Sequence, residues 1–298
     1  MSRPSRVPVL EVGGSHVTAG WVRPDGWQVS EVRRRDLPAG GSAGQLIEIL
    51  AAAGAGLAAG PGAAWAIAMP GPFDYARGVA HYAGVGKFEA LAGVDVGAAL
   101  TEALRPGTLC FSNDASAFAV GEWLIGAGRG ATRCVAVTLG TGIGSAFLDK
   151  GVSVSTGPSV PPQAELHLLS HAGRPLEDWV SSRAIRAGYL RAGGSVDREV
   201  VEIAGLARAG DAAAGAAFDA AFRVLGEVLG PWLERFGADR LVIGGSISRS
   251  FDLVEGPLRA GLSAATDCRL PIVTAAEPEL APLVGAAFAV CSGYRHQA

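Results

Sequence analysis

Cysteine is scarce in this chain, and the cysteines present are never clustered. The 298 residues contain four of them, Cys110, Cys134, Cys268 and Cys291, and no two form a Cys-x-x-Cys pair. Closely spaced cysteine pairs are typical of structural zinc sites, and a high cysteine density is typical of disulfide-bonded secreted domains. The sequence therefore argues against both, and we expect neither disulfides nor zinc.

Long runs of basic residues are missing as well. The formal net charge is −3, and the longest basic block is Arg33-Arg34-Arg35. Nucleic-acid-binding domains usually carry a basic patch or stripe. We therefore expect no nucleic acid among the partners of this protein.

A membrane-spanning run is not predicted either. Residues 49–73 carry no charge, but they are mostly Ala and Gly and are interrupted by Pro61-Gly62. This pattern indicates the end of a helix, a turn and a buried strand. The first eight residues are followed by only a short apolar strand that contains Glu11, so the N-terminal sequence does not resemble a signal peptide. We expect a cytoplasmic protein without a membrane partner.

Glycine, in contrast, is abundant, with 43 residues, and its most informative cluster lies within residues 135–148. There an apolar strand breaks into a turn and resumes as a second strand; the turn region contains Gly140, Thr141, Gly142 and Gly144. Glycines allow positive φ angles and let successive backbone N–H groups approach an anion, while Thr138 and Thr141 add hydroxyl donors. The pattern predicts a phosphate-binding turn, with a plain β-hairpin turn as the alternative.

A weaker copy of this pattern occupies residues 9–22, with Gly13, Gly14 and Ser15 in its turn. Alignment of Glu11 with Thr138 gives an offset of 127 residues (138 − 11 = 127), which is too long for a solenoid repeat and suits a duplicated domain. Two such turns facing each other across a cleft would hold a polyphosphate from both sides. We therefore expect two lobes, with a hairpin turn again as the alternative for this copy.

Helix and strand signals alternate along the whole chain, which indicates an α/β protein. Three strands are expected within 7–36, followed by a helix at 43–59, a strand at 64–68, a hairpin at 78–85, a helix at 94–104, a strand at 108–111 and a helix at 115–126. The second half is expected to contain helices at 175–191, 211–236 and 282–291, and a strand within 240–248 that ends in glycines. An apolar stripe at helical spacing within 211–236 is assigned to the core; it comprises Phe218, Phe222, Leu225, Leu229 and Leu233.

Five short motifs follow one another along the chain. They are Glu11-Val-Gly-Gly-Ser15, Pro70-Gly-Pro-Phe-Asp74, Asn113-Asp-Ala115, Leu139-Gly-Thr-Gly-Ile-Gly144 and Ile243-Gly-Gly-Ser-Ile247. In this order they resemble the ROK family of sugar kinases, open reading frames and repressors, and the resemblance covers nearly the whole chain. It implies the two-lobed actin-like (ribonuclease H-like) ATPase fold, in which duplicated α/β domains flank a cleft. The expected small lobe is 1–115 with the C-terminal helix 280–298, and the large lobe is 116–279.

The resemblance also implies a nucleotide site that binds ATP and Mg²⁺. Its expected phosphate-binding residues are Gly13, Gly14, Ser15, Thr138, Gly140, Thr141, Gly142 and Gly144, and its adenosine-binding residues are Gly244 and Gly245. Glu11 stands where the family has Asp and is expected to hold Mg²⁺ through water.

Transfer of a phosphoryl group to a sugar hydroxyl needs a group that removes the hydroxyl proton. The resemblance assigns this general-base role to Asp114, and it assigns acceptor binding to Asn113, Asp114 and Gly71. Taken alone, Asn113-Asp114 is also a plausible helix cap.

Three further residues carry over as acceptor ligands. Glu165 and Glu177 stand where the family binds sugar hydroxyls with Glu, and paired carboxylates suit a polyol because each accepts several hydroxyl hydrogens. Two solvated surface acids remain the alternative. His167 is expected to contact the substrate or to be an ordinary loop histidine.

Departures from the family pattern leave the acceptor open. The cysteine-rich zinc loop of the family is replaced by 170–176, and residues 81–87 lack the Asn usually found where a hexose binds. The leading interpretation is a glucokinase-like enzyme that uses ATP; the alternatives are a cyclitol kinase acting on a valiolone- or valienol-type ring and a polyphosphate-dependent glucokinase. A non-catalytic sugar-binding or regulatory protein is the alternative of another class. Dimers are common in the family, and we expect a homodimer.

Overall fold

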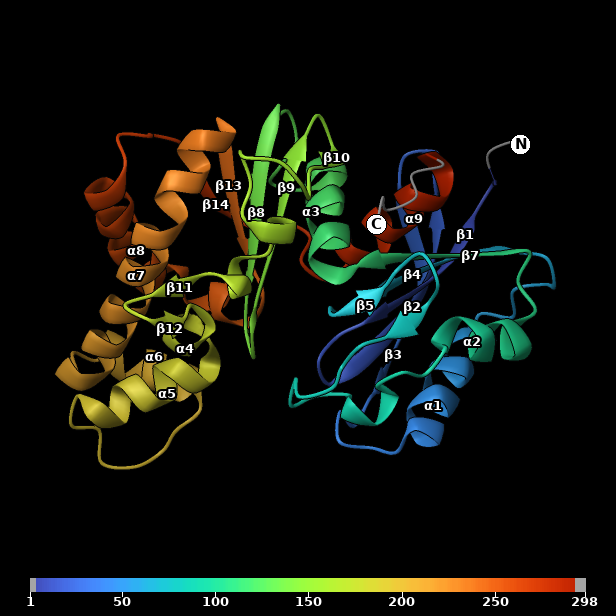
Figure 1. Cartoon of the computed structure of the whole chain (residues 1–298), viewed down its shortest axis with the longest axis horizontal. Helices are drawn as coiled ribbons and strands as arrows, with labels where there is room; N and C mark the ends of the chain where they lie inside the picture. The colour runs from blue at the N-terminus through green and yellow to red at the C-terminus, as the bar shows by residue number, and fades with distance from the viewer. Residues whose placement is uncertain (1–3, 293–298) are drawn as a thin grey trace. The chain divides into compact units, whose positions relative to one another are not determined.

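The computed structural model describes residues 4–292 and divides into two compact units (Figure 1). Unit 1 runs to Ile125 and also contains the C-terminal segment from Glu279, and unit 2 is Gly126–Pro278. Helix α3 (Asp114–Ile125) belongs to unit 1, whereas the sequence placed most of it in the second lobe. Residues 1–3 and 293–298 of the expected first lobe lie outside the described residues.

Unit 1 is built on a five-stranded sheet with the order β3-β2-β1-β4-β7. The strands are β1 (Val7–Val12), β2 (His16–Arg23), β3 (Gln28–Asp36), β4 (Ala64–Met69) and β7 (Thr108–Asn113). Strands β1, β2 and β3 form an antiparallel meander, and β4 and β7 run parallel to β1. A short pair, β5 (Phe73–Asp74) and β6 (Val79–Ala80), replaces the hairpin expected at 78–85.

Helices cover both faces of this sheet. On one face α1 (Ala43–Ala55) and α2 (Val96–Leu104) pack against Leu10 and Val12 of β1, and on the other α3 and α9 (Ala281–Ser292) pack against Val7 and Val9. Successive side chains of a strand point to opposite faces. Glu11 therefore lies on the face that carries α3.

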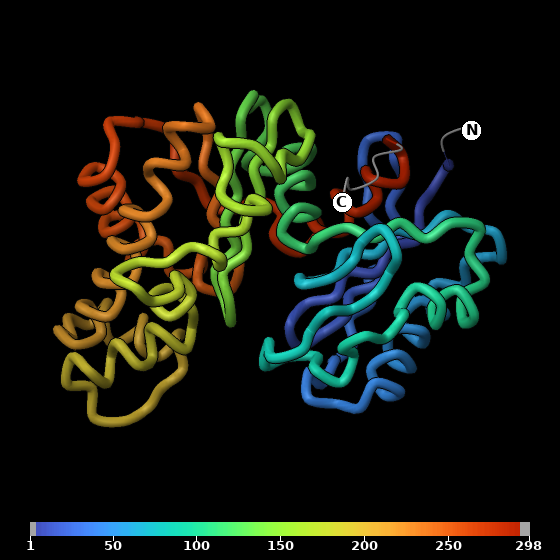
Figure 2. Tube along the Cα trace, viewed as in Figure 1, coloured from blue at the N-terminus to red at the C-terminus, as the bar shows by residue number. Residues whose placement is uncertain are grey.

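Figure 2 shows the C-terminal segment returning to the N-terminal part of the chain, where α9 lies beside α3. Two glycines make this approach close. A Cβ at Gly121 of α3 would lie 1.9 Å from the carbonyl oxygen of Ala281, and one at Gly285 of α9 would lie 1.8 Å from that of Ala117. The two helices thus pack backbone against backbone, which requires glycine at both positions.

Unit 2 repeats the strand plan of unit 1, with the order β10-β9-β8-β13-β14. Its strands are β8 (Arg133–Leu139), β9 (Ile143–Asp149), β10 (Val152–Ser153), β13 (Arg240–Gly244) and β14 (Ile272–Thr274). Strands β8, β9 and β10 form an antiparallel meander, and β13 and β14 run parallel to β8. The two equivalent sheets confirm that an α/β domain is duplicated, as the two glycine turns predicted.

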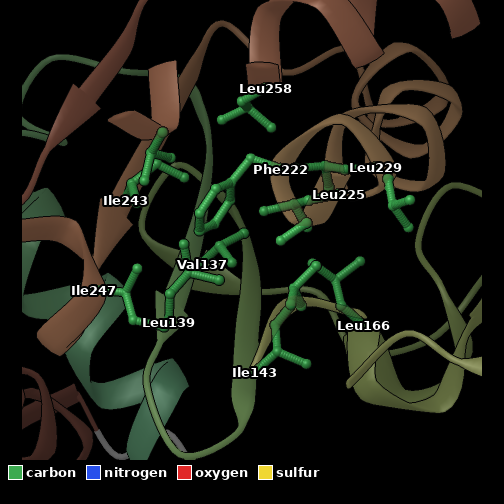
Figure 3. Packing of buried hydrophobic residues seen from close by; sticks show 14 of the residues in the cluster. Val137, Leu139, Ile143, Leu166, Phe222, Leu225, Leu229, Ile243, Ile247 and Leu258 are labelled. Carbon is green, nitrogen blue, oxygen red and sulfur yellow. The ribbon is translucent and has the colours of Figure 1, made fainter. Parts of the chain in front are cut away.

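The core of unit 2 lies between this sheet and two long helices, α7 (Ala212–Phe236) and α8 (Phe251–Ala265). The expected stripe of α7 is buried throughout. Figure 3 shows Phe222 and Leu225 of that stripe directed toward Val137 of β8 and Ile243 of β13. The assignment of this stripe to the core is confirmed.

Several predicted boundaries were wrong. The helix expected at 175–191 is two helices, α4 (Glu177–Val180) and α5 (Ser182–Arg191), because Ser181 is extended and its side chain caps α5. The first helix ends at Ala55 rather than 59. Helix α6 (Val200–Arg208) was not predicted. Within residues 4–292, no helix has the length and apolar character needed to cross a membrane.

Candidate functional site

Polar residues of unit 1 gather where the parallel strands β1, β4 and β7 end. Glu11 is the next-to-last residue of β1, Met69 at the end of β4 pairs with Asn113 at the end of β7, and β4 continues into Gly71. The carboxyl edge of parallel strands is the usual ligand-binding edge of an α/β sheet. The fold of unit 1 thus brings Glu11, Gly71, Asn113 and Asp114 to one edge.

Asn113 caps helix α3, so Asp114 is not needed for that purpose. The Oδ1 atom of Asn113 accepts a hydrogen bond of 2.9 Å from the backbone N–H of Ser116, and its Nδ2 donates to the Tyr75 hydroxyl at 3.0 Å. Asp114 is the first residue of α3, and its Oδ1 accepts a bond of 2.8 Å from the N–H of Ala115. Its carboxylate has further lone pairs for a ligand.

The carboxyl groups of Asp114 and Glu11 have raised pKa values. Burial is the main cause for Asp114, while the charge of Lys87 and backbone N–H groups act to lower its pKa. The pKa of Glu11 is raised to about 7, first by burial and then by the charge of Asp114; the Thr18 hydroxyl and the charge of Arg34 lower it. Two carboxyl groups that repel each other in a partly buried place suit a hard cation with oxygen ligands, and Glu11 fits Mg²⁺ in this respect.

The first glycine turn is tightly closed. The N–H of Gly13 donates to the carbonyl of His16 at 2.9 Å, and a Cβ at Gly13 would lie 2.7 Å from Cε1 of the His16 ring. That ring lies between Arg34, whose Nη2 is 3.0 Å from His16 Nδ1, and Glu11, whose Oε2 is 3.7 Å from His16 Nε2. Burial and then the charge of Arg34 lower the pKa of His16. Gly14 and Ser15 follow Gly13 in this turn and are exposed.

The second glycine turn, in unit 2, is held by helix α5 and by the fifth motif, Ile243–Ile247. The carbonyl of Gly140 accepts bonds from the N–H and the hydroxyl of Ser182, at 2.8 and 2.9 Å. Gly245 has φ +81°, and a Cβ there would lie 2.3 Å from the carbonyl oxygen of Leu139. Thr138 at the end of β8 also pairs with Gly244 at the end of β13. The ends of these two strands are therefore in contact. Unit 2 thus brings together the expected residues Thr138, Gly140, Thr141, Gly142, Gly144, Gly244 and Gly245.

Glu177 lies over this second turn. It begins α4, and its Oε1 is 2.7 Å from the position that a Cβ would take at Gly142. Glu165 lies between η2 (Pro162–Ala164) and η3 (Leu166–Leu168), and His167 lies within η3. The two side chains form a pair in which Glu165 Oε2 and His167 Nε2 are 3.3 Å apart. His167 is therefore placed to hold the Glu165 carboxylate.

A small hairpin, β11 (Ser170–His171) and β12 (Arg174–Pro175), forms within residues 170–176, the segment in which the sequence predicts no zinc loop. The Trp179 indole N–H donates to the carbonyl of His171 at 3.2 Å and the two rings make an edge contact, while the Arg174 guanidinium lies over the indole. Among residues 4–292 there is no group of three or more metal-ligating side chains. Aromatic and hydrogen-bonding contacts hold this hairpin.

We therefore expect dialysis against EDTA to leave the far-UV circular dichroism and the melting temperature unchanged. As a positive control for the same hairpin, Trp179→Leu removes the stacked side chain and is expected to lower the melting temperature. A melting temperature that falls on chelation and recovers with zinc would contradict this assignment.

Sequence reasoning missed Lys87, Tyr82 and Ser182. Lys87 influences Asp114, the fully buried Tyr82 donates to the carbonyl of Pro70 at 2.7 Å, and Ser182 holds Gly140. One signal was available for Lys87, because the chain contains only two lysines and this one lies in the atypical segment 81–87. Tyr82 and Ser182 act through contacts between distant segments, which no local pattern reveals.

Lys87 yields a prediction about pH dependence. Its charge lowers the pKa of Asp114, so Lys87→Met should raise that pKa. Any activity that needs ionised Asp114 should then begin at a higher pH, and we expect the acid limb of the kcat/KM profile to move upward. Lys150→Met removes the only other lysine, in unit 2, and serves as the control. An unmoved acid limb in Lys87→Met would contradict the prediction.

Comparison with known proteins agrees with these observations. The model of the ROK family matches residues 8–291. A glucokinase from Thermotoga maritima is 30% identical over 275 residues, which cover 84% of each chain.

Solved structures share the fold. The ROK hexokinase from Thermus thermophilus has a TM-score of 0.76 at 23% identity and covers 96% of this chain and 98% of its own. A ROK family glucokinase from Streptomyces griseus, solved with glucose and AMPPNP, has a TM-score of 0.76 at 23% identity over 95% of this chain and 98% of its own. The inorganic polyphosphate/ATP-glucomannokinase from Arthrobacter sp. strain KM has a TM-score of 0.70 at 26% identity over 98% and 100%. The predicted fold class, the actin-like ATPase fold of these kinases, is confirmed.

Proposed function

Because the chain belongs to the ROK family, we propose that it transfers the γ-phosphoryl group of ATP to a hydroxyl group of a hexose or a hexose-like polyol. Its similarity to a glucokinase and a glucomannokinase identifies the protein as a carbohydrate kinase. The main structural support for the proposed reaction is the position of Asp114. A partly buried carboxyl group with a raised pKa stands at the ligand-binding edge of a sheet, and a neighbouring residue performs the capping.

Asp114 acts as the general base in this proposal. The hydroxyl proton of the acceptor passes to a carboxylate oxygen of Asp114, the hydroxyl oxygen forms a bond to the γ-phosphorus, and the bond from that phosphorus to the β-bridging oxygen breaks. Asn113 binds a second hydroxyl group, since each of its amide atoms has capacity beyond its present partner. Gly71 supplies backbone to the same acceptor site.

The carboxylates of unit 2 bind other hydroxyl groups of the acceptor. Glu165 and Glu177 accept hydroxyl hydrogens, and charged acceptors form stronger hydrogen bonds than neutral ones. His167 holds Glu165 in place and is also proposed to contact the acceptor.

The phosphates of the donor are bound by the backbone of the two glycine turns, and Gly244 and Gly245 bind the adenosine. Mg²⁺, when bound, neutralises charge on the phosphates; Glu11 would hold it through water. The crystal structure of the Streptomyces griseus glucokinase contains AMPPNP, an analogue of ATP, and this supports ATP as the donor. Polyphosphate is a second candidate, favoured by the similarity to the polyphosphate/ATP-glucomannokinase.

The acceptor itself is proposed as a hexose. The glucokinase from Thermotoga maritima supports this choice. A cyclitol is the second candidate, favoured by the atypical segment 81–87, in which Lys87 stands close enough to affect Asp114. We also propose that the protein is a cytoplasmic homodimer.

A phosphorylation screen tests acceptor and donor together. Glucose, mannose, amino sugars and cyclitols are each incubated with Mg²⁺ and either ATP or polyphosphate, and phosphate esters are detected by ³¹P nuclear magnetic resonance. We expect ester formation with a hexose and ATP. Binding of sugars without any ester would favour the non-catalytic regulatory alternative.

A further inference from the structure

Ser145 links the strand of the second glycine turn to the segment that carries Glu165. It lies in β9, three residues after Gly142, and only 5% of its surface is exposed. Its hydroxyl donates to the carbonyl of Ala164 at 2.7 Å and accepts from the N–H of Leu166 at 2.9 Å. The Ser145 hydroxyl thus bonds to the residue before Glu165 and to the residue after it.

The turn before Glu165 has a backbone that requires such support. Gln163 and Ala164 both have positive φ angles, 57° and 60°, which are unfavourable for residues with a side chain. Ala164 and Leu166 are buried, so their backbone groups must find partners inside the protein. The Ser145 hydroxyl satisfies one group of each.

Glu177, the other carboxylate proposed to bind the acceptor, depends on the same pair of strands. Its Oε1 occupies the space that a side chain at Gly142 would fill. The β8–β9 hairpin, which carries the phosphate-binding turn, thus contacts both segments that supply acceptor ligands.

We propose that Ser145 is a positioning residue that fixes Glu165 for acceptor binding, so that the strand carrying the second phosphate turn also sets the affinity for the acceptor. The proposal rests on the acceptor role proposed above for Glu165. Ser145 itself touches neither substrate; it acts through the backbone on both sides of Glu165.

The test is a double-mutant cycle of Ser145→Ala and Glu165→Ala, read as KM for the acceptor and for ATP. Loss of two buried hydrogen bonds frees the turn, and we expect Ser145→Ala to raise the acceptor KM about tenfold while the ATP KM changes less than about twofold. In the Glu165→Ala background Ser145→Ala should raise the acceptor KM no further, because both substitutions then act on one contact. Ser145→Thr, which keeps the hydroxyl, should restore most of the affinity.

A matched control comes from unit 1. Ser112 is also 5% exposed, but its hydroxyl has no hydrogen-bond partner among residues 4–292, so Ser112→Ala should leave the acceptor KM unchanged. If Ser145→Ala does not fold, Ser145→Cys replaces it in the cycle. Because a thiol is a weaker hydrogen-bond donor than a hydroxyl group, we expect Ser145→Cys to raise the acceptor KM, but by less than about tenfold. An unchanged acceptor KM, or an equal rise with and without Glu165, would overturn the proposal.

Hydrogen exchange separates this proposal from the proposed function. The amide of Leu166 should exchange at least about ten times faster in Ser145→Ala than in the wild type, and Ser145→Thr should restore its protection. Unchanged Leu166 exchange would overturn the positioning role even in an active enzyme. A wild-type protein that neither binds nor phosphorylates any sugar would instead overturn the proposed function and the acceptor role of Glu165, whatever the exchange rate shows.

Discussion

Asp114→Asn is expected to lower kcat by about three orders of magnitude, within the range that general-base catalysis contributes. The amide has nearly the shape of the carboxylate but cannot take the proton of the acceptor hydroxyl. Because Asn113 provides the cap of α3, the substitution should leave the fold intact. Steady-state kinetics measure the loss, and calorimetry should find ATP binding changed less than about twofold.

Asp252→Asn is the matched control for this experiment. Asp252 also lies in the first turn of a helix, α8, but it is exposed and paired with Arg208. Its replacement should leave kcat near the wild-type value. Near-native turnover in Asp114→Asn would remove Asp114 from the mechanism.

Gly285→Ala is expected to reduce the free energy of unfolding by about 3 kcal/mol, at the upper end of the usual cost of overpacking a core. The new methyl group would lie 1.8 Å from the carbonyl oxygen of Ala117, and a backbone atom cannot rotate away as a side chain can. Helices α9 and α3 must then move apart. Asp114 is the first residue of α3, so this movement also affects the helix that positions the proposed base. Denaturation with guanidinium chloride measures the change.

The same substitution at Gly205 should have the opposite sign. Gly205 lies inside α6 and is exposed, and a Cβ there meets no atom of the described residues within 4 Å apart from its chain neighbours and the backbone of its own helix. Gly205→Ala is therefore expected to stabilise the protein by about 0.5–1 kcal/mol, since alanine loses less conformational entropy in a helix. Equal effects of the two substitutions would contradict the backbone-to-backbone packing of α3 and α9.

The sequence revealed much of this fold because its strongest signals are local. The two glycine turns between apolar strands predicted the duplication, and the spacing of Phe218, Phe222 and Leu225 predicted the buried face of α7. The same signals identified the motif residues that the two units place at their strand ends. The positive φ angles expected of the turn glycines are not found: Gly13 and Gly142 instead leave room for the side chains of His16 and Glu177, which a Cβ would approach to 2.7 Å.

Contacts between distant segments could not be predicted in this way. Gly285 looks like any small helical residue until the carbonyl of Ala117 is seen beside it. Ser145 is one more polar residue in a glycine-rich motif, although it fixes a turn some twenty residues later. The break at Ser181 was missed because a serine is tolerated within a helix as well as at its cap, and only its extended backbone distinguishes the two.

Acceptor-dependent phosphoryl transfer tests the central claim most directly. The purified protein is incubated with Mg²⁺ and ATP, with and without the best sugar acceptor, and ADP, free phosphate and phosphate ester are quantified in the same sample. We predict one phosphate ester for each ADP formed, with little ADP in the absence of the acceptor. ADP matched by free phosphate, with no ester whichever acceptor is supplied, would contradict the assignment of this protein as a kinase that acts on a sugar hydroxyl.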